Sequence, residues 1–142
     1  LPFMPFMIFM VKTRKANMSR IFSDLSHRVI GCAIEVHKYL GPGLLESAYQ
    51  RCLAHELHLN DIPFITEAPL PIEYKGTRLD CGYRMDILVD NAIILELKSV
   101  DALHPIHEAQ ILSYMKLASL RYGFLINFNV PILKNGLKSF IL

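Results

Sequence analysis

The chain has few cysteines, few charged residues and no apolar run long enough to cross a membrane. Its three cysteines are widely spaced and form no C-x-x-C motif, which argues against a disulfide framework and favours a reducing, cytoplasmic environment. The most apolar stretch, residues 1–11, is about half of the ~20 residues that span a bilayer, and prolines interrupt it. Low-complexity tracts and internal repeats are also absent, which with the hydrophobic composition excludes a disordered or fibrous protein.

What is present describes one globular domain. The chain has 142 residues, of which 52% are hydrophobic and 20% charged, enough to bury a sizeable core. The net charge of +2 permits binding to nucleic acid without requiring it.

The N-terminus is expected to lie outside this domain. Basic residues follow the apolar run of residues 1–11 instead of preceding it, as they would in a secretory signal. We therefore expect an extension over residues 1–20 and a folded domain over residues 21–142, without a membrane partner.

Charged residues interrupt an apolar hairpin pattern in the middle of the chain. Val, Ile and Leu dominate residues 87–89 and 93–97, which predicts two buried strands joined by a turn. Asp86, Glu96 and Lys98 stand within or beside this pattern, and the last two share a strand face because they are two residues apart. Such charges cost several kcal/mol among aliphatic side chains unless they pair or bind a metal.

The length of the turn decides whether the two acids meet. With a two-residue loop, Val89 pairs with Ala92 and the acids lie on opposite faces. With a three-residue loop or a bulge, Val89 pairs with Ile93 and Asp86 lies opposite Glu96. We expect the second register, because bulges and three-residue turns are common beside active sites.

Opposed carboxylates favour a metal site. They repel each other, and one takes up a proton unless a cation lies between them. Hard oxygen ligands with open positions for water suit Mg²⁺ or Mn²⁺. The pattern thus predicts a metal-dependent phosphodiesterase, and the alternative is a structural ion pair, Glu96 with Lys98 or Asp86 with Arg84.

A second motif, Gly43-x-x-Glu46-x-x-Tyr49, follows a Gly-Pro-Gly break. Together with RMDILVDNAIILELKS, EAQILSYMKL and YGFLINFNVP, it closely resembles the GxxExxY protein family, which is assigned to the PD-(D/E)xK nuclease superfamily with its restriction-endonuclease-like fold. The resemblance runs from about Ile21 to the C-terminus and implies a metal-dependent nuclease core that acts on nucleic acid.

Position by position, the resemblance implies that Asp86 and Glu96 are catalytic metal ligands and that Glu46 is a helical acid assisting the metal. Lys98 completes the E-x-K pair as a catalytic residue. Met85 stands where the superfamily name has proline, a position that varies widely.

The resemblance also implies roles for three residues on helices. Gln110 and Tyr114 match a Q-x-x-x-Y pattern on the helix after the sheet, with Gln110 catalytic and Tyr114 accessory. Tyr49 is accessory too. From the residues alone, Gln110 and Tyr114 could equally stand at the core boundary, and the Tyr49 hydroxyl could instead fasten one helix to the next.

The fold class we expect is α/β (α+β), in the order α-α-β-β-β-α-β, with a mixed central sheet flanked by helices. The pattern predicts helices over residues 23–40, 44–59 and 102–120, and extended segments over residues 64–67, 70–74, 78–89, 93–98 and 122–128. The last helix should turn inward Ile106, Ala109, Leu112, Met115 and Leu117. The last strand is continuously apolar and should be buried on both faces.

We therefore expect a cytoplasmic nuclease that hydrolyses DNA or RNA with Mg²⁺ or Mn²⁺. The sequence does not decide whether the protein forms a homodimer. The alternative is a non-catalytic nucleic-acid-binding or protein-interaction module that retains the nuclease fold. Zinc is not expected, because the helix-spaced pairs His55/His58 and His104/His107 lack a third and a fourth ligand at a plausible spacing.

Overall fold

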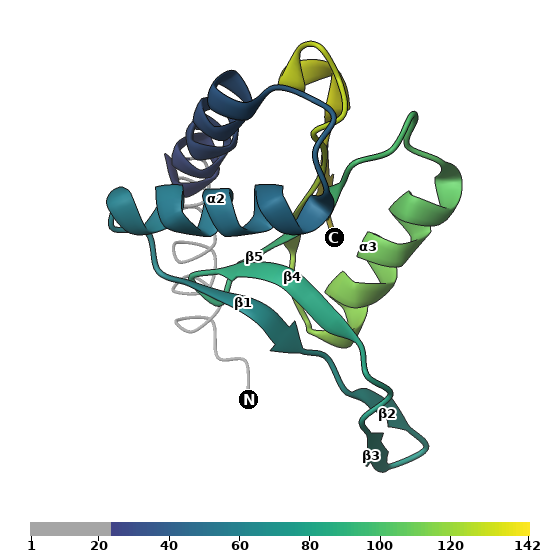
Figure 1. Cartoon of the computed structure of the whole chain (residues 1–142). Helices are drawn as coiled ribbons and strands as arrows, with labels where there is room; N and C mark the ends of the chain where they lie inside the picture. Colours follow the sequence, from purple (N-terminus) through teal and green to yellow (C-terminus); the bar gives the residue numbers. More distant parts are fainter. Residues whose placement is uncertain (1–23) are drawn as a thin grey trace, which may run out of the picture. The chain divides into compact units, whose positions relative to one another are not determined.

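A computed structural model describes residues 24–142 of the chain (Figure 1). The chain divides into two compact units, Leu1–Gly31 and Cys32–Leu142, and the described residues of the first unit are helical. The expected N-terminal extension and the start of the expected domain at residue 21 lie outside the described residues. None of the helices found in residues 24–142 combines the length and the apolar character that crossing a membrane requires.

A mixed five-stranded sheet forms the centre of the second unit, with the strand order β1-β4-β5-β6-β7. Only β5 and β6 are parallel, and the other neighbours are antiparallel. The strands are β1 (Phe64–Pro69), β4 (Arg84–Val89), β5 (Ile93–Lys98), β6 (Tyr122–Asn127) and β7 (Leu137–Ile141). This sheet confirms the expected mixed α/β fold.

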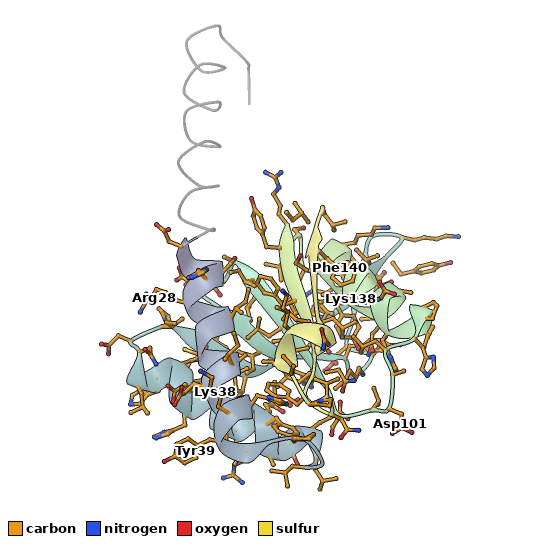
Figure 2. All side chains as sticks on the ribbon, turned by 90° about the horizontal axis from the view of Figure 1, so that it is seen from above. Arg28, Lys38, Tyr39, Asp101, Lys138 and Phe140 are labelled. Carbon is orange, nitrogen blue, oxygen red and sulfur yellow. The ribbon has the colours of Figure 1, made fainter. Side chains whose placement is uncertain are left out.

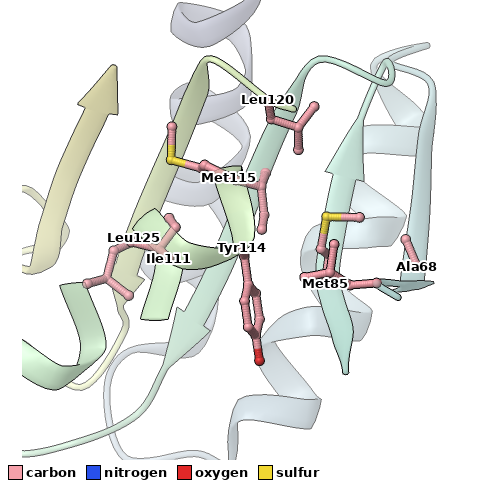
Figure 3. Packing of buried hydrophobic residues seen from close by; sticks show 9 residues of the cluster. Ala68, Met85, Ile111, Tyr114, Met115, Leu120 and Leu125 are labelled. Atoms are coloured by element: carbon pink, nitrogen blue, oxygen red, sulfur yellow. The ribbon is translucent and has the colours of Figure 1, made fainter. Parts of the chain in front are cut away.

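Helices lie on both faces of the sheet. Residues 24–40 are helical, and α2 (Glu46–Leu59) and α3 (Pro105–Leu117) follow. Figure 3 shows α3 in front of the central strands and α2 behind them. A short 3₁₀ helix, η1 (Leu133–Gly136), leads into β7.

The chain between β1 and β4 differs from the expectation. Instead of one strand over residues 78–89, β2 (Ile72–Tyr74) and β3 (Thr77–Leu79) form a separate hairpin, which projects beyond β1 and β4 in Figure 1. The break falls at Gly82, whose backbone has a φ of 79° and whose N–H donates to Asp80 Oδ1 at 2.9 Å. This Asx turn ends the hairpin and starts β4 afresh.

The expected inward face of α3 was largely wrong. Met115 is buried as expected, but Ile106 and Leu117 are 72% and 40% exposed. The face that packs on the sheet carries Ile111, Tyr114 and Met115 (Figure 3). Because that cluster includes a tyrosine, apolar periodicity alone misplaced the buried stripe.

The last expected strand was correct. In β6 every residue after Tyr122 is buried, as expected for a strand covered on both faces. Gly123 lies where α3 approaches the sheet closely, and a Cβ there would meet Met115 Sδ at 2.8 Å. The following strand, β7, was not predicted, and the salt bridge from Lys138 Nζ to Glu108 Oε2 (3.3 Å) ties it to α3; Lys138 is labelled in Figure 2.

Candidate active site

The β4–β5 hairpin has the register that brings the two acids together. Val89 pairs with Ile93, which confirms the longer turn, and Asp90 and Asn91 both adopt left-handed backbone conformations within it. Regular pairing continues to Ile87 and Leu95 and stops there. The next position along the ladder would pair Asp86 with Glu96.

At that position the carboxyl groups take over the backbone hydrogen bonds. The Asp86 N–H donates to Glu96 Oε1 at 3.2 Å, and the Leu97 N–H donates to Asp86 Oδ2 at 2.8 Å. The two carboxyl groups also lie close enough that each shifts the pKa of the other. The strands therefore part at these residues, and the gap is closed by side chains.

Burial and mutual repulsion make this pair hold a proton. Glu96 is only 4% exposed, and burial, followed by the charge of Asp86, raises its pKa from 4.5 to about 8. Burial also raises the pKa of Asp86, with a further contribution from the negative charge of Glu67. Without a cation, the pair is protonated at neutral pH, and a bound cation would take the place of that proton.

Lys98 is the positive group of the site. It follows Glu96 by two residues on β5, is half-buried, and its charge lowers the pKa of both carboxyl groups. Arg84 pairs with Asp80 at 3.5 Å instead of with Asp86, and within residues 24–142 no ion pair joins Glu96 to Lys98.

On the α3 side, Tyr114 lies within electrostatic reach of the pair. Burial raises the pKa of its hydroxyl, with smaller contributions from Glu96, Tyr83 and Asp86. The Gln110 side-chain amide donates to the Tyr114 hydroxyl at 3.0 Å. Of the Q-x-x-x-Y pair, the hydroxyl of Tyr114 thus lies within electrostatic reach of the acids, and the amide of Gln110 is directed to that hydroxyl.

Glu46 is not brought into this group. It is exposed at the start of α2, and it is not among the charges that shift the pKa of Asp86 or Glu96. The start of α2 is nevertheless tied to the end of β5, because the Ser99 hydroxyl donates to Leu44 O at 2.5 Å. The role of Glu46 as a metal-assisting acid stays a prediction.

Tyr49 has a structural place. Its ring is fully buried and stacks on Phe128 with a centroid distance of 4.5 Å. Its hydroxyl donates to Gly41 O at 2.6 Å and accepts from the Leu44 N–H at 3.1 Å. Because Gly41 and Gly43 both have positive φ angles, the Gly-Pro-Gly loop turns sharply around this hydroxyl. Tyr49 fastens the entry of α2, and no contact here places it at the acids.

We expect Tyr49→Phe to lower the free energy of unfolding by about 1–3 kcal/mol, because it leaves a buried donor and acceptor without their partner. Chemical denaturation monitored by circular dichroism measures this. The exposed Tyr74 is the matched control, and Tyr74→Phe should change little. Equal stability of the two variants would contradict the structural role of the hydroxyl.

Three residues near the acids were not predicted from the sequence: Gln50, Glu67 and Asn127. The Gln50 amide donates both to Asp86 O (3.1 Å) and to Glu67 Oε1 (2.8 Å). Asn127 is buried and bonds both the N–H and the carbonyl of Val100, which fixes the chain after Lys98. Gln50 is the residue after Tyr49, the last position of the Gly43-x-x-Glu46-x-x-Tyr49 motif, but a single glutamine forms no recognisable motif in the sequence.

The oxygen atoms at the site fit a hard divalent cation that keeps most of its water. Within the part of the chain that the structure describes, no three His, Cys, Asp or Glu side chains gather closely enough to hold a metal ion. Half-buried Asp86 and buried Glu96 supply two neighbouring carboxyl groups, one of which carries a proton that a cation can displace. Mg²⁺ and Mn²⁺ are commonly held by one or two carboxylates with water in the other positions.

A family model described as the PD-(D/E)XK nuclease superfamily matches residues 23–140, almost the whole described chain and all the residues discussed above. Searches of curated proteins and of solved structures gave no match.

Proposed function

Because the chain belongs to the PD-(D/E)XK nuclease superfamily, we propose that it is a metal-dependent phosphodiesterase that hydrolyses nucleic acid. The observation that supports this most is that the carboxyl groups of Asp86 and Glu96 both turn into the point where β4 and β5 part and accept backbone hydrogen bonds there. A structural ion pair would explain one of these acids, but not a half-buried Asp86 held beside a buried Glu96. On its Gly43-x-x-Glu46-x-x-Tyr49 motif, we assign the chain to the GxxExxY family within that superfamily.

In this proposal Asp86 and Glu96 hold Mg²⁺ or Mn²⁺, and Glu46 assists through water. A divalent ion held there would supply a Lewis acid that lowers the pKa of a bound water. The backbone N–H groups of Asp86 and Leu97 hold the two carboxyl groups in place. When ionised, these carboxyl groups would therefore fix the position of the ion relative to the nucleic acid. Lys98 places a positive charge beside the phosphate and stabilises the negative charge that develops on it.

The residues of α3 would act at the edge of the site. The amide of Gln110 donates to Tyr114, so we propose that it orients this hydroxyl, which lies near both acids, toward a phosphate oxygen. Tyr83 packs edge-on against Tyr114 with a centroid distance of 5.8 Å and is 43% exposed. Together these side chains form a polar and aromatic border beside the carboxyl groups.

Cleavage assays on single- and double-stranded DNA and RNA test the proposal. We expect cleavage with Mg²⁺ or Mn²⁺, none with EDTA, and at least a hundredfold loss in Asp86→Asn, which removes the charge while keeping the hydrogen bond from Leu97. Glu73→Gln, a change at an exposed acid of the β2–β3 hairpin, should cleave as wild type. Binding of nucleic acid without cleavage under all these conditions would support the non-catalytic alternative instead.

A further inference from the structure

Glu67 occupies an unusual place in β1. The pairing of β1 with β4 matches Thr66 to Ile87 and Ala68 to Met85, so Glu67 falls opposite Asp86. That pair is missing from an otherwise continuous ladder.

The irregularity coincides with the one between β4 and β5. Regular pairing of those two strands also stops before Asp86 and Glu96. Glu67, Asp86 and Glu96 therefore form one row across three neighbouring strands. In this row the ladder of β1 with β4 is interrupted, and the ladder of β4 with β5 has ended.

The backbone of Glu67 is held in a conformation that its residue type disfavours. Its φ is 52°, a left-handed value that is uncommon for a residue other than glycine, asparagine or aspartate, and rarer still inside a strand. Such conformations persist only where the surroundings enforce them, and they gather at functional sites.

The side chain of Glu67 is fixed as well. Gln50 of α2 reaches it with a hydrogen bond of 2.8 Å and uses the same amide nitrogen to bind Asp86 O. The Glu67 carboxylate is exposed, so it remains accessible to water, and its charge acts on the carboxyl of Asp86. One amide thus links the exposed Glu67 carboxylate to the backbone of the half-buried Asp86.

We propose that Glu67 is a further residue of the cation site, which positions the hydrated ion through water from the side opposite Glu96, while Gln50 holds it in register with Asp86. This rests on the proposed function. Because the Glu67 carboxylate is exposed, it keeps its own hydration when the ion binds. Its oxygen atoms can accept hydrogen bonds from the water molecules that the cation retains.

The test is Mn²⁺ binding to the intact protein, measured by titration calorimetry at pH 8.5. Glu67→Gln keeps the acceptor for Gln50 and removes only the charge; we expect an affinity about three- to tenfold lower, an effect of one unit charge acting across water. Higher salt should narrow this difference, because the carboxylate is exposed. Glu73→Gln, which removes an exposed acid of the separate β2–β3 hairpin, should bind Mn²⁺ as wild type.

A second variant separates a role in the site from a role in the fold. Glu67→Gly relieves the left-handed conformation and should raise the melting temperature while it weakens Mn²⁺ binding. A structural role would give the opposite result, a lower melting temperature with unchanged affinity, and would overturn the proposal.

Asp86→Asn distinguishes this failure from failure of the proposed function. If Asp86→Asn loses Mn²⁺ binding while Glu67→Gln binds as tightly as Glu73→Gln, the role of Glu67 is wrong and the site stands. If Asp86→Asn binds Mn²⁺ as wild type does, both proposals are overturned.

Discussion

Glu96→Gln should make the metal-free protein more stable than wild type at pH 8 and above, and should abolish the stabilisation that Mg²⁺ or Mn²⁺ gives. The glutamine has nearly the same size and is neutral. Its carbonyl can accept from the Asp86 N–H as Oε1 of Glu96 does, and its amide can donate to the Asp86 carboxylate. The variant thus keeps the hydrogen bonds of the protonated acid. It avoids the free-energy cost of ionising a buried carboxyl group beside Asp86.

The pH dependence follows from the raised pKa. Between pH 4.5 and about 8, Glu96 keeps its proton in the folded protein but has released it in the unfolded chain. The unfolded state binds fewer protons, so the stability of wild type falls as the pH rises through this window. Below pH 4.5 this contribution vanishes, and above about 8 the destabilisation is complete, amounting to several kcal/mol. Asp86 contributes with the same sign, because its pKa is raised too.

Thermal melts at pH 5 and pH 8.5, with and without Mg²⁺, measure both effects. Wild type should lose stability at the higher pH and regain it with Mg²⁺, because a bound ion favours the ionised folded form. Glu96→Gln should show a much smaller pH slope and no response to Mg²⁺. Glu73→Gln, the exposed control, should behave as wild type. A clear loss of metal-free stability in Glu96→Gln at pH 8.5 would instead favour a structural ion pair.

The central hairpin could be predicted from the sequence because its constraints are local. A shift of one residue moves every side chain to the other face, so the requirement that Asp86 meet Glu96 selected the pairing of Val89 with Ile93. The continuous apolar run of β6 was equally informative, since a strand covered on both faces has no polar alternation to misread.

Other features depend on contacts that the sequence does not encode locally. Glu67 has no distinctive pattern in the sequence, and its left-handed backbone lies where the pairing of β1 with β4 is interrupted opposite Asp86. Gln50 became relevant through two acceptors, one of them a backbone carbonyl 36 residues away. On α3, Tyr114 is buried on the face that also carries Ile111, so a rule that treats tyrosine as a boundary residue displaces the predicted stripe.

The second large effect is expected at Lys98, where replacement should separate binding of the ion from cleavage. Lys98→Gln removes a positive charge that lowers the pKa of both Asp86 and Glu96. The carboxyl groups then ionise at a higher pH, so affinity for Mn²⁺ should fall at pH 7. At a pH high enough to ionise both acids, affinity should equal or exceed that of wild type, because a repelling cation is gone.

Cleavage by Lys98→Gln should remain at least about a hundredfold slower even at that higher pH, since no positive side chain then faces the charge developing on the phosphate. Lys116→Gln is the control: this lysine is exposed on α3, and its loss should reduce cleavage only slightly, through weaker binding of the phosphate backbone. Titration calorimetry with Mn²⁺ and cleavage rates measured across the same pH range give both quantities. If raising the pH restores cleavage as fully as it restores Mn²⁺ binding, Lys98 serves only to keep the carboxyl groups ionised. If it restores binding alone, the lysine acts on the phosphate, as its position beside the ionised pair predicts.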